Sequence, residues 1–275
     1  MEKYSVLMSV YFREKPENLE EAMASMMNQT AKPDEFVLVC DGDLTEELDA
    51  VIDKYEKQYP EILKVVRIPK SPNWAEVLNI GLRECKNELI ARMDSDDISV
   101  LDRCEKQLNF LKEHPEVACV STSIGEFFDS KDKIDNVRAL PEKHEDIVKF
   151  AKLRCPLNHA TAMYKKSAIV GSGEYVYFPA YEDYHLWVRM IQKGYVLHNM
   201  PDILYLMRAG ENLYERRGGL EYCKVMAKFR RWMRDQGLLS TFEMIITIIS
   251  NGAVVLMPNK LRGIIYKTFL RKKTD

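Results

Sequence analysis

Short apolar segments alternate with amphipathic helical patterns along the first hundred residues of this 275-residue chain. Each apolar segment is too short for a surface helix and is typical of a buried strand. Such an alternation predicts an α/β fold, in which a mostly parallel sheet is covered by helices on both faces. We expect strands over residues 5–12, 36–40, 63–68 and 88–93.

The alternation continues to about residue 121 and then becomes irregular. We expect a helix over 101–114, a strand over 117–121, mixed short strands and loops through 125–160, and a helix over 182–194. Asp43 followed by Glu46 predicts a capping box at the start of the second helix. The length allows one large domain. We therefore expect an α/β domain over residues 1–220 and a helical appendage over 221–275.

The expected appendage combines an apolar run with basic residues. Residues 242–257 are nearly uncharged, whereas residues 224–275 hold 11 Lys and Arg against 3 Asp and Glu. The apolar run is shorter than the ~20 residues that cross a bilayer, and a Ser-Asn-Gly sequence at 250–252 interrupts it. An apolar face beside cationic residues is typical of segments that lie on an anionic membrane surface. A hairpin docked on the α/β domain is the alternative.

Six cysteines are spread along the chain without any Cys-x-x-Cys pair. They fall mostly in apolar runs, which indicates small buried residues in a reducing compartment and not a disulfide or zinc framework. The first residues lack the basic flank and apolar stretch of a secretory signal. We therefore expect a cytoplasmic protein that is peripheral to the inner face of the cytoplasmic membrane.

A strand that runs directly into three acids is the strongest candidate for a functional site. Asp94, Asp96 and Asp97 follow the apolar residues 89–93. Because side chains alternate along a strand, we expect Asp94 and Asp96 to project together and to share one divalent cation. Oxygen ligands favour Mg²⁺ or Mn²⁺ over zinc, and diphosphate oxygens suit the remaining positions. Helix capping, a role open to Asp97 or Ser99, is the alternative.

Other carboxylates also follow the ends of expected elements. Tyr11, Asp41 and Asp94 all lie at or just beyond strand ends, and ligands of open α/β sheets gather at that edge. Glu182 and Asp183 lie among aromatic residues before a helix, an environment that suits a general base. An ordinary turn explains Asp41 equally well, and helix capping explains the later pair equally well.

Five short segments, in this order and at these separations, resemble the family 2 glycosyltransferases of the GT-A fold. They are the first strand, the turn after the second strand, a Leu-Asn-Ile-Gly-Leu sequence, the acidic tract and the later acidic pair, at residues 6–11, 41–42, 78–82, 90–97 and 182–183. The resemblance covers roughly residues 3–220. It implies a Rossmann-like GT-A sheet and an inverting, nucleotide-sugar-dependent enzyme of the kind that builds bacterial surface polysaccharides.

The resemblance also implies a role for each matching residue. Asp183 would be the catalytic base, with Glu182 beside it, and Asp94 and Asp96 would hold the metal, Mn²⁺ or Mg²⁺. The donor, usually a UDP-sugar, would contact residues from the strand ends and the matching segments, namely Val10, Tyr11, Asp41, Asn79, Arg92, Asp94 and Ser95.

Three positions depart from the family pattern. Cys40 stands where many members have an additional acid before the turn glycine, so that only Asp41 can make that contact. Trp74 stands where many members have a glycine, near the expected diphosphate. Ala209 follows Arg208 in a place where members often have a histidine, which argues against a histidine metal ligand there.

Four further residues are candidates for contacts with the acceptor or with phosphate. His159 falls where the family commonly has a histidine near the acceptor side. Arg208 matches an arginine of the family and directly precedes Ala209. Arg216 and Arg217 suit a cationic loop over a diphosphate, because a guanidinium group matches phosphate geometry. A solvated turn is the alternative for this arginine pair.

Together with these features, the resemblance implies a membrane-peripheral, metal-dependent inverting glycosyltransferase. It would move Gal, GalNAc, Glc or GlcNAc from UDP to a hydroxyl of a lipid-linked saccharide in capsule, exopolysaccharide or lipopolysaccharide synthesis. A sugar-phosphate nucleotidyltransferase would need a glycine-rich loop after the first strand, and residues 9–17 contain no glycine. A catalytically inactive membrane-associated scaffold is the other alternative. Nucleic-acid binding is not expected, because the basic residues lie beside an aliphatic run and not among stacking aromatics.

Overall fold

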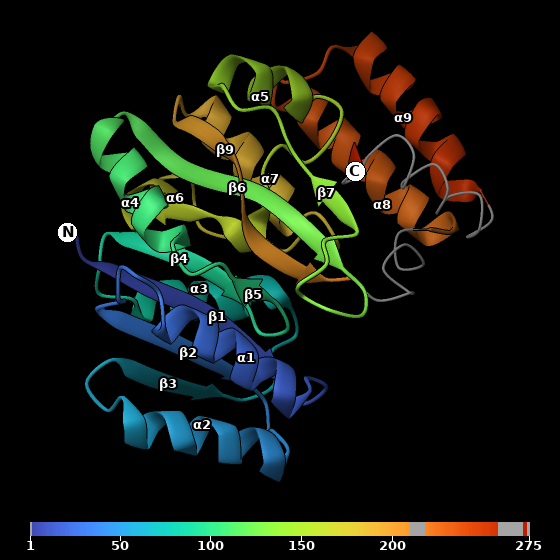
Figure 1. Cartoon of the computed structure of the whole chain (residues 1–275). Helices are drawn as coiled ribbons and strands as arrows, with labels where there is room; N and C mark the ends of the chain where they lie inside the picture. Colours follow the sequence, from blue (N-terminus) through green and yellow to red (C-terminus); the bar gives the residue numbers. More distant parts are fainter. Residues whose placement is uncertain (1, 210–217, 258–271, 274–275) are drawn as a thin grey trace.

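A single mixed sheet forms the centre of the computed structural model, which describes residues 2–209, 218–257 and 272–273 (Figure 1). The strands run in the order β10-β7-β6-β8-β4-β1-β2-β3, and β9 pairs with β5 and β6. The four strands β3, β2, β1 and β4 pair in parallel, as the alternation predicts. The strand bounds are β1 (Tyr4–Tyr11), β2 (Glu35–Asp41), β3 (Leu63–Ile68), β4 (Leu89–Asp94), β5 (Ile98–Ser99), β6 (Val117–Phe127), β7 (Asn136–Arg138), β8 (Met163–Lys165), β9 (Val196–Arg208) and β10 (Lys272–Lys273).

Helices cover both faces of this sheet, because neighbouring residues of the buried strands point to opposite sides. One core contains Val6 and Met8 of β1 with apolar residues of α1, α2 and α4. The other contains Leu7 with residues of α3, α5, α6 and α7. The helix bounds are α1 (Pro16–Met27), α2 (Glu46–Gln58), α3 (Trp74–Glu84), α4 (Arg103–Glu113), α5 (His144–Ala151), α6 (Lys166–Gly171), α7 (Glu182–Gln192), α8 (Leu220–Asp235) and α9 (Thr241–Leu256), with a 3-10 turn at His159–Thr161.

The helix starts correct two expectations from the sequence. The first turn of α2 is capped by Thr45, whose hydroxyl accepts a hydrogen bond from the Leu48 N–H, and not by a capping box from Asp43. At the start of α4, the side chain of Gln29 accepts a hydrogen bond of 2.9 Å from the Cys104 N–H. Neither Asp97 nor Ser99 therefore caps this helix. Gln29, which follows the C-terminal end of α1, supplies this acceptor through a long-range contact, and no local pattern indicates it.

The irregular segment after residue 121 holds more regular structure than expected. Strand β6 continues to Phe127, and α5 forms within the segment that was expected to hold only short strands and loops. The helix expected over 182–194 is confirmed as α7, which begins at Glu182.

The C-terminal appendage is a helical hairpin docked on α7 (Figure 1). Met226, Phe229 and Met233 of α8 are buried against Tyr181 and the first half of α7. Ser240 and Glu243 form a capping box at the start of α9, which continues through the Ser-Asn-Gly sequence that was expected to interrupt it. No helix in the described part of the chain combines the length and the apolar character needed to cross a bilayer.

Candidate active site

A cavity of about 520 Å³ lies at the carboxyl ends of β1, β2 and β4, and we call it the strand-end cavity. Tyr11 is paired with Asp41, and Ser9 with Asp94, in the parallel ladders, so the strand ends meet at one edge of the sheet. This is the geometry that the sequence predicts. The cavity is lined by every predicted donor and metal residue except Asn79, that is by Val10, Tyr11, Asp41, Arg92, Asp94, Ser95 and Asp96.

Three carboxylates converge at the end of β4. One oxygen from each of Asp94, Asp96 and Asp97 lies within 4.8 Å of the others. Asp97, for which helix capping was the alternative role, is buried, and its Oδ1 accepts a hydrogen bond of 2.8 Å from the Arg208 N–H. Three carboxylate oxygens at this spacing fit a hard divalent cation such as Mg²⁺ or Mn²⁺.

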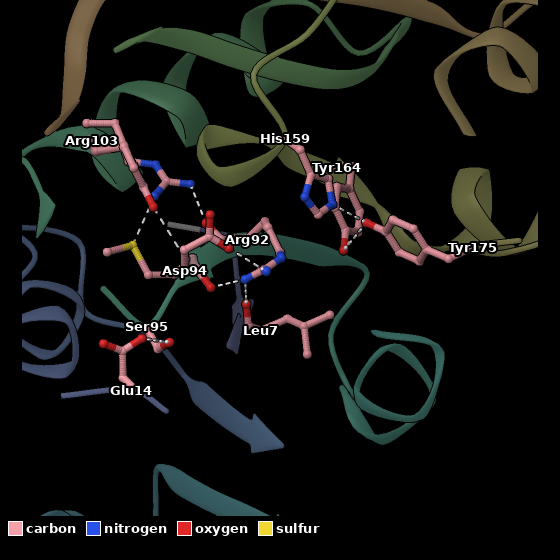
Figure 2. Close-up of polar contacts among 11 residues, drawn as sticks. Leu7, Glu14, Arg92, Asp94, Ser95, Arg103, His159, Tyr164 and Tyr175 are labelled. Atoms are coloured by element: carbon pink, nitrogen blue, oxygen red, sulfur yellow. Dashed lines mark hydrogen bonds and ion pairs between the residues drawn. The ribbon is translucent and has the colours of Figure 1, made fainter. Parts of the chain in front are cut away.

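The clustered acids at the end of β4 repel one another, which makes ionisation of each carboxyl group less favourable. Packing against protein atoms, and then the charges of Asp94 and Glu14, raise the pKa of Asp96 to about 6. The side chain of Asp96 is also exposed at the cavity mouth, where solvent moderates this shift. Glu14 lies in the loop before α1 and accepts a hydrogen bond of 2.8 Å from the Ser95 hydroxyl (Figure 2). Glu14 could not be identified from the sequence, because no spacing rule links it to the acidic tract.

Arg92 is the buried cation of this site (Figure 2). Its guanidinium group donates to Asp94 Oδ1 at 2.6 Å and to the backbone oxygens of Leu7 and Met93. It also lies over the ring of Trp74, with 5.3 Å between the guanidinium carbon and the ring centroid. Arg92 thus fixes the orientation of Asp94 and of one wall of the cavity.

Two predicted donor residues are already engaged in protein contacts. Asp41 Oδ1 accepts a hydrogen bond of 2.6 Å from the Ser71 N–H, which holds the loop before α3 against the cavity. The side chain of Asn79 is buried and makes two hydrogen bonds of 2.8 Å with the backbone of Tyr175. Asn79 therefore positions the Tyr175 segment and does not face the strand-end cavity.

An aromatic wall of Trp74, His159 and Tyr175 lies behind the strand-end cavity. The rings of Trp74 and His159 meet edge to face with 5.3 Å between centroids, and His159 Nε2 lies 2.9 Å from the Tyr175 hydroxyl. Burial, and then the charge of Arg92, hold the pKa of His159 well below its usual range, so the imidazole is neutral. His159 lies in this wall and does not line the cavity.

Asp183 lies in a second cavity, of about 250 Å³, between the start of α7 and the helical hairpin. We call this the hairpin cavity. Asp183 Oδ2 lies 3.6 Å from the Cys155 Sγ, and burial, followed by the charge of Asp183, raises the pKa of this thiol well above its usual range. A neutral thiol therefore donates to the carboxylate. Burial also raises the pKa of Glu182.

The predicted arginine contacts have other partners or lie outside the described residues. The side chain of Arg208 pairs with Glu21 of α1 and lies over the ring of Phe127. It is thereby directed toward α1. Arg216 and Arg217 fall within 210–217, which lie outside the described residues.

The parallel sheet and the acid-lined cavity at its carboxyl edge define a glycosyltransferase of the GT-A fold, and three comparisons agree. Residues 5–170 match the model of Glycosyl transferase family 2, so the chain belongs to this family. The chain is 35% identical over 268 residues to the amylovoran biosynthesis glycosyltransferase AmsE of Erwinia amylovora, covering 96% of this chain and 98% of AmsE.

A second relative has a more specific name. The UDP-Gal:alpha-D-GlcNAc-diphosphoundecaprenol beta-1,3-galactosyltransferase of Escherichia coli is 35% identical over 271 residues, which are 98% of this chain and 97% of that enzyme. Among solved structures, S. aureus TarS 1–349 in complex with UDP-GlcNAc superposes with a TM-score of 0.68 at 16% identity, over 98% of this chain and 76% of TarS. The relatives are glycosyltransferases of polysaccharide biosynthesis, and the structural likeness shows the fold.

Proposed function

We propose that this protein is a metal-dependent inverting glycosyltransferase. It moves a sugar of the Gal, GalNAc, Glc or GlcNAc class from UDP to a hydroxyl of a lipid-linked saccharide during synthesis of a bacterial surface polysaccharide. The convergence of Asp94, Asp96 and Asp97 at the end of β4 carries the proposal. The UDP-GlcNAc in the TarS complex supports the donor class, and the name of the E. coli relative supports a lipid-linked acceptor.

The strand-end cavity is the proposed donor site. Its volume of about 520 Å³ lies within the ~300–1,000 Å³ that is usual for ligands of this size. Val10, Tyr11 and Asp41 at the ends of β1 and β2 would hold the nucleoside, and the acids at the end of β4 would face the diphosphate. Trp74 gives this cavity an aromatic wall in place of the open space that a glycine would leave.

Asp94, Asp96 and Asp97 would hold the metal ion, Mn²⁺ or Mg²⁺. Bound there, the ion would supply electrostatic stabilisation for the diphosphate as it leaves. Arg92 holds the Asp94 carboxylate in place, and Glu14 accepts from Ser95 next to it. Arg92 thus fixes the Asp94 carboxylate, and the Arg208 N–H of β9 fixes that of Asp97, before a ligand arrives, which lowers the reorganisation needed during the reaction.

Asp183 is the proposed general base. Its carboxylate would take the proton of the acceptor hydroxyl while that oxygen attacks the anomeric carbon from the face opposite UDP. The Cys155 thiol donates a hydrogen bond to Asp183 Oδ2, and the Tyr184 N–H donates one to Oδ1. These two contacts hold the carboxylate in one orientation. Attack from the opposite face inverts the anomeric centre without a covalent intermediate.

The exposed face of α9 is the proposed membrane contact. Phe242, Ile245, Ile246, Ile249 and Leu256 are all exposed, at helical spacing along one side of this helix. The sequence that follows, 260–273, adds six Lys and Arg, which would complement an anionic bilayer. The docked hairpin and the membrane contact are therefore compatible, because opposite faces of α9 serve them.

Transfer from a panel of UDP-sugars to a lipid-linked GlcNAc acceptor, with and without Mn²⁺, tests the proposed reaction. We expect product from at least one UDP-sugar, and only when the metal is present. The NMR coupling constants of the product should show an anomeric configuration opposite to that of the donor. UDP binding without transfer to any acceptor would instead favour the inactive scaffold.

Co-sedimentation with anionic phospholipid vesicles tests the membrane contact. Replacing Phe242 and Ile249 by Ser should weaken binding on the order of tenfold or more, because each buried apolar side chain contributes about 1.5–3 kcal/mol. Leu101→Ser, which changes an exposed leucine beside α4, is the matched control and should bind as the wild type does. Equal vesicle binding by all three proteins would contradict the assignment.

A further inference from the structure

Arg230 is a buried cation in the wall of the hairpin cavity, and it has no acidic partner within the part of the chain that the structure describes. Arg230 is 3% exposed. Its guanidinium group donates hydrogen bonds to the carbonyl oxygens of Lys152 and Leu153 and to the Tyr184 hydroxyl. Its Nε atom has no hydrogen-bond partner among residues 2–209, 218–257 and 272–273. Arg230 takes part in none of the ion pairs among the described residues. A buried charge that is compensated only by neutral groups favours an anionic ligand.

Two further arginines line the same cavity from other parts of the chain. Arg138 ends β7 and Arg154 follows α5, so three cations from separate elements line this cavity together with Asp183, the one carboxylate among the described residues of the lining. Three guanidinium groups match the several oxygens of a diphosphate better than those of a single carboxylate. The volume of about 250 Å³ suits one sugar unit with its phosphates and not a long saccharide.

The remaining lining is apolar and comes largely from the hairpin. Met226 of α8 and Val254 and Val255 of α9 form one wall. The opposite side of α9 carries the exposed apolar face, so the cavity lies one helix thickness from the proposed membrane surface. A general base, three cations and an apolar wall together fit an amphiphile whose first sugar carries a lipid diphosphate.

We infer that the hairpin cavity binds the diphosphate of the lipid-linked acceptor through Arg138, Arg154 and Arg230. This inference rests on the proposed function and deepens it. It makes the α8–α9 hairpin part of the acceptor site, and not only an anchor. The sugar next to the diphosphate then lies against Asp183, which places its hydroxyl at the base.

Direct binding of prenyl compounds tests the cavity without any transfer assay. Farnesyl diphosphate, farnesyl monophosphate and farnesol are titrated calorimetrically into the full-length protein in EDTA, so that metal-assisted binding in the strand-end cavity is excluded. We expect affinity to fall in that order. Arg138→Gln and Arg154→Gln should each weaken farnesyl diphosphate binding roughly tenfold or more, the effect of losing one charge-assisted hydrogen bond.

Matched variants separate a loss of the site from a loss of the fold. Arg234→Gln removes an α8 arginine that pairs with Asp235 outside the cavity, and it should bind farnesyl diphosphate as the wild type does. Arg230→Lys keeps the charge but loses the planar contacts. Because Arg138 and Arg154 are half-exposed, their variants remain informative even if the Arg230 variant fails to fold.

The outcomes distinguish this inference from the proposed function. If farnesyl diphosphate does not bind, or binds equally to the Arg154, Arg138 and Arg234 variants, the inference is wrong. The proposed function still stands in that case if a GlcNAc alkyl glycoside without phosphate accepts the sugar as well as a GlcNAc-diphosphate-lipid does. If UDP fails to bind with Mn²⁺, the proposed function fails independently.

Discussion

The guanidinium group of Arg92 donates a hydrogen bond of 2.6 Å to Asp94 Oδ1, two residues further along the same strand. Side chains two apart in a strand share one face, so β4 itself sets this pair. Arg92 is 1% exposed, whereas the side chain of Asp94 is 35% exposed at the strand-end cavity. A buried cation thus holds a partly exposed acid in the orientation in which it can meet a ligand.

Arg92→Lys should weaken UDP binding in Mn²⁺ by roughly tenfold, because a single ammonium cannot keep the hydrogen bonds to Asp94 and to two backbone oxygens. Isothermal titration measures the effect. Arg67→Lys changes a surface arginine paired with Asp49 and should leave the affinity unchanged. Wild-type affinity in Arg92→Lys would show that Asp94 does not depend on this contact.

Asp183→Asn should retain UDP-sugar binding but lose transfer by on the order of a hundredfold or more, the usual contribution of a positioned general base. Glu182→Gln should lose less, because Glu182 does not line the hairpin cavity. Turnover numbers and donor dissociation constants, measured for both variants, test this. Near-normal turnover of Asp183→Asn would assign the base to another residue.

Gly81→Ala should destabilise the fold by about 1–3 kcal/mol, because α3 lies against the sheet at this residue. An added Cβ would overlap Leu7 Cδ1 and lie 2.8 Å from Val39 Cγ2. Gly252→Ala, in α9, would place its Cβ 3.7 Å from Cys223 Sγ and should be neutral or stabilising. Urea unfolding compares the two variants, and equal stability would show that α3 can shift outward at low cost.

Acidification should destabilise the docking of the hairpin through His185. The His185 ring stacks on the ring of Trp232 of α8, with 3.9 Å between the ring centroids. Burial, followed by the charge of Arg189, lowers the pKa of His185 to about 4. In the unfolded chain the His185 imidazole takes up its proton near pH ~6.5, whereas in the folded protein it does so only near pH 4. The contribution of neutral His185 to the free energy of unfolding is therefore fully present above pH ~6.5 and is lost as the pH falls toward 4. Buried His159 acts in the same direction.

The melting temperature, measured at about pH 7.5 and about pH 5, tests this linkage. The decrease between the two should be smaller in His185→Gln than in the wild type, since that variant has no imidazole to protonate. His114→Gln, beyond the end of α4, should show the full wild-type decrease. An unchanged decrease in His185→Gln would remove His185 from the linkage.

Local pattern was sufficient to predict the parallel strands β1 to β4 and the edge of the sheet at which the candidate site lies. The strands that end in Tyr11, Asp41 and Asp94 are continuous apolar runs, and the carboxyl ends of parallel strands meet by geometry. The residues that escaped prediction act across the chain. Gln29, just after α1, caps α4, and Glu14 joins the acids from a loop.

The hairpin cavity could not be predicted for the same physical reason. Its lining combines β7, the segment after α5, α7, α8 and α9, and no spacing in the sequence reports the packing of five separate elements. Asn79 shows the reverse case, because its segment matches the family pattern while its buried amide bonds the backbone of Tyr175. Only the packing of α3 against that loop reveals this role.

Calorimetric titration of UDP into wild type and Asp96→Asn, with Mn²⁺ and with EDTA, tests whether the acids at the end of β4 hold a metal ion that in turn binds the diphosphate. Asp102→Asn, which changes a surface acid paired with Lys106, is the matched control. We expect tight, Mn²⁺-dependent UDP binding in the wild type and in Asp102→Asn, and no UDP binding in Asp96→Asn. UDP affinity that is the same with and without Mn²⁺, or that Asp96→Asn retains, would contradict it.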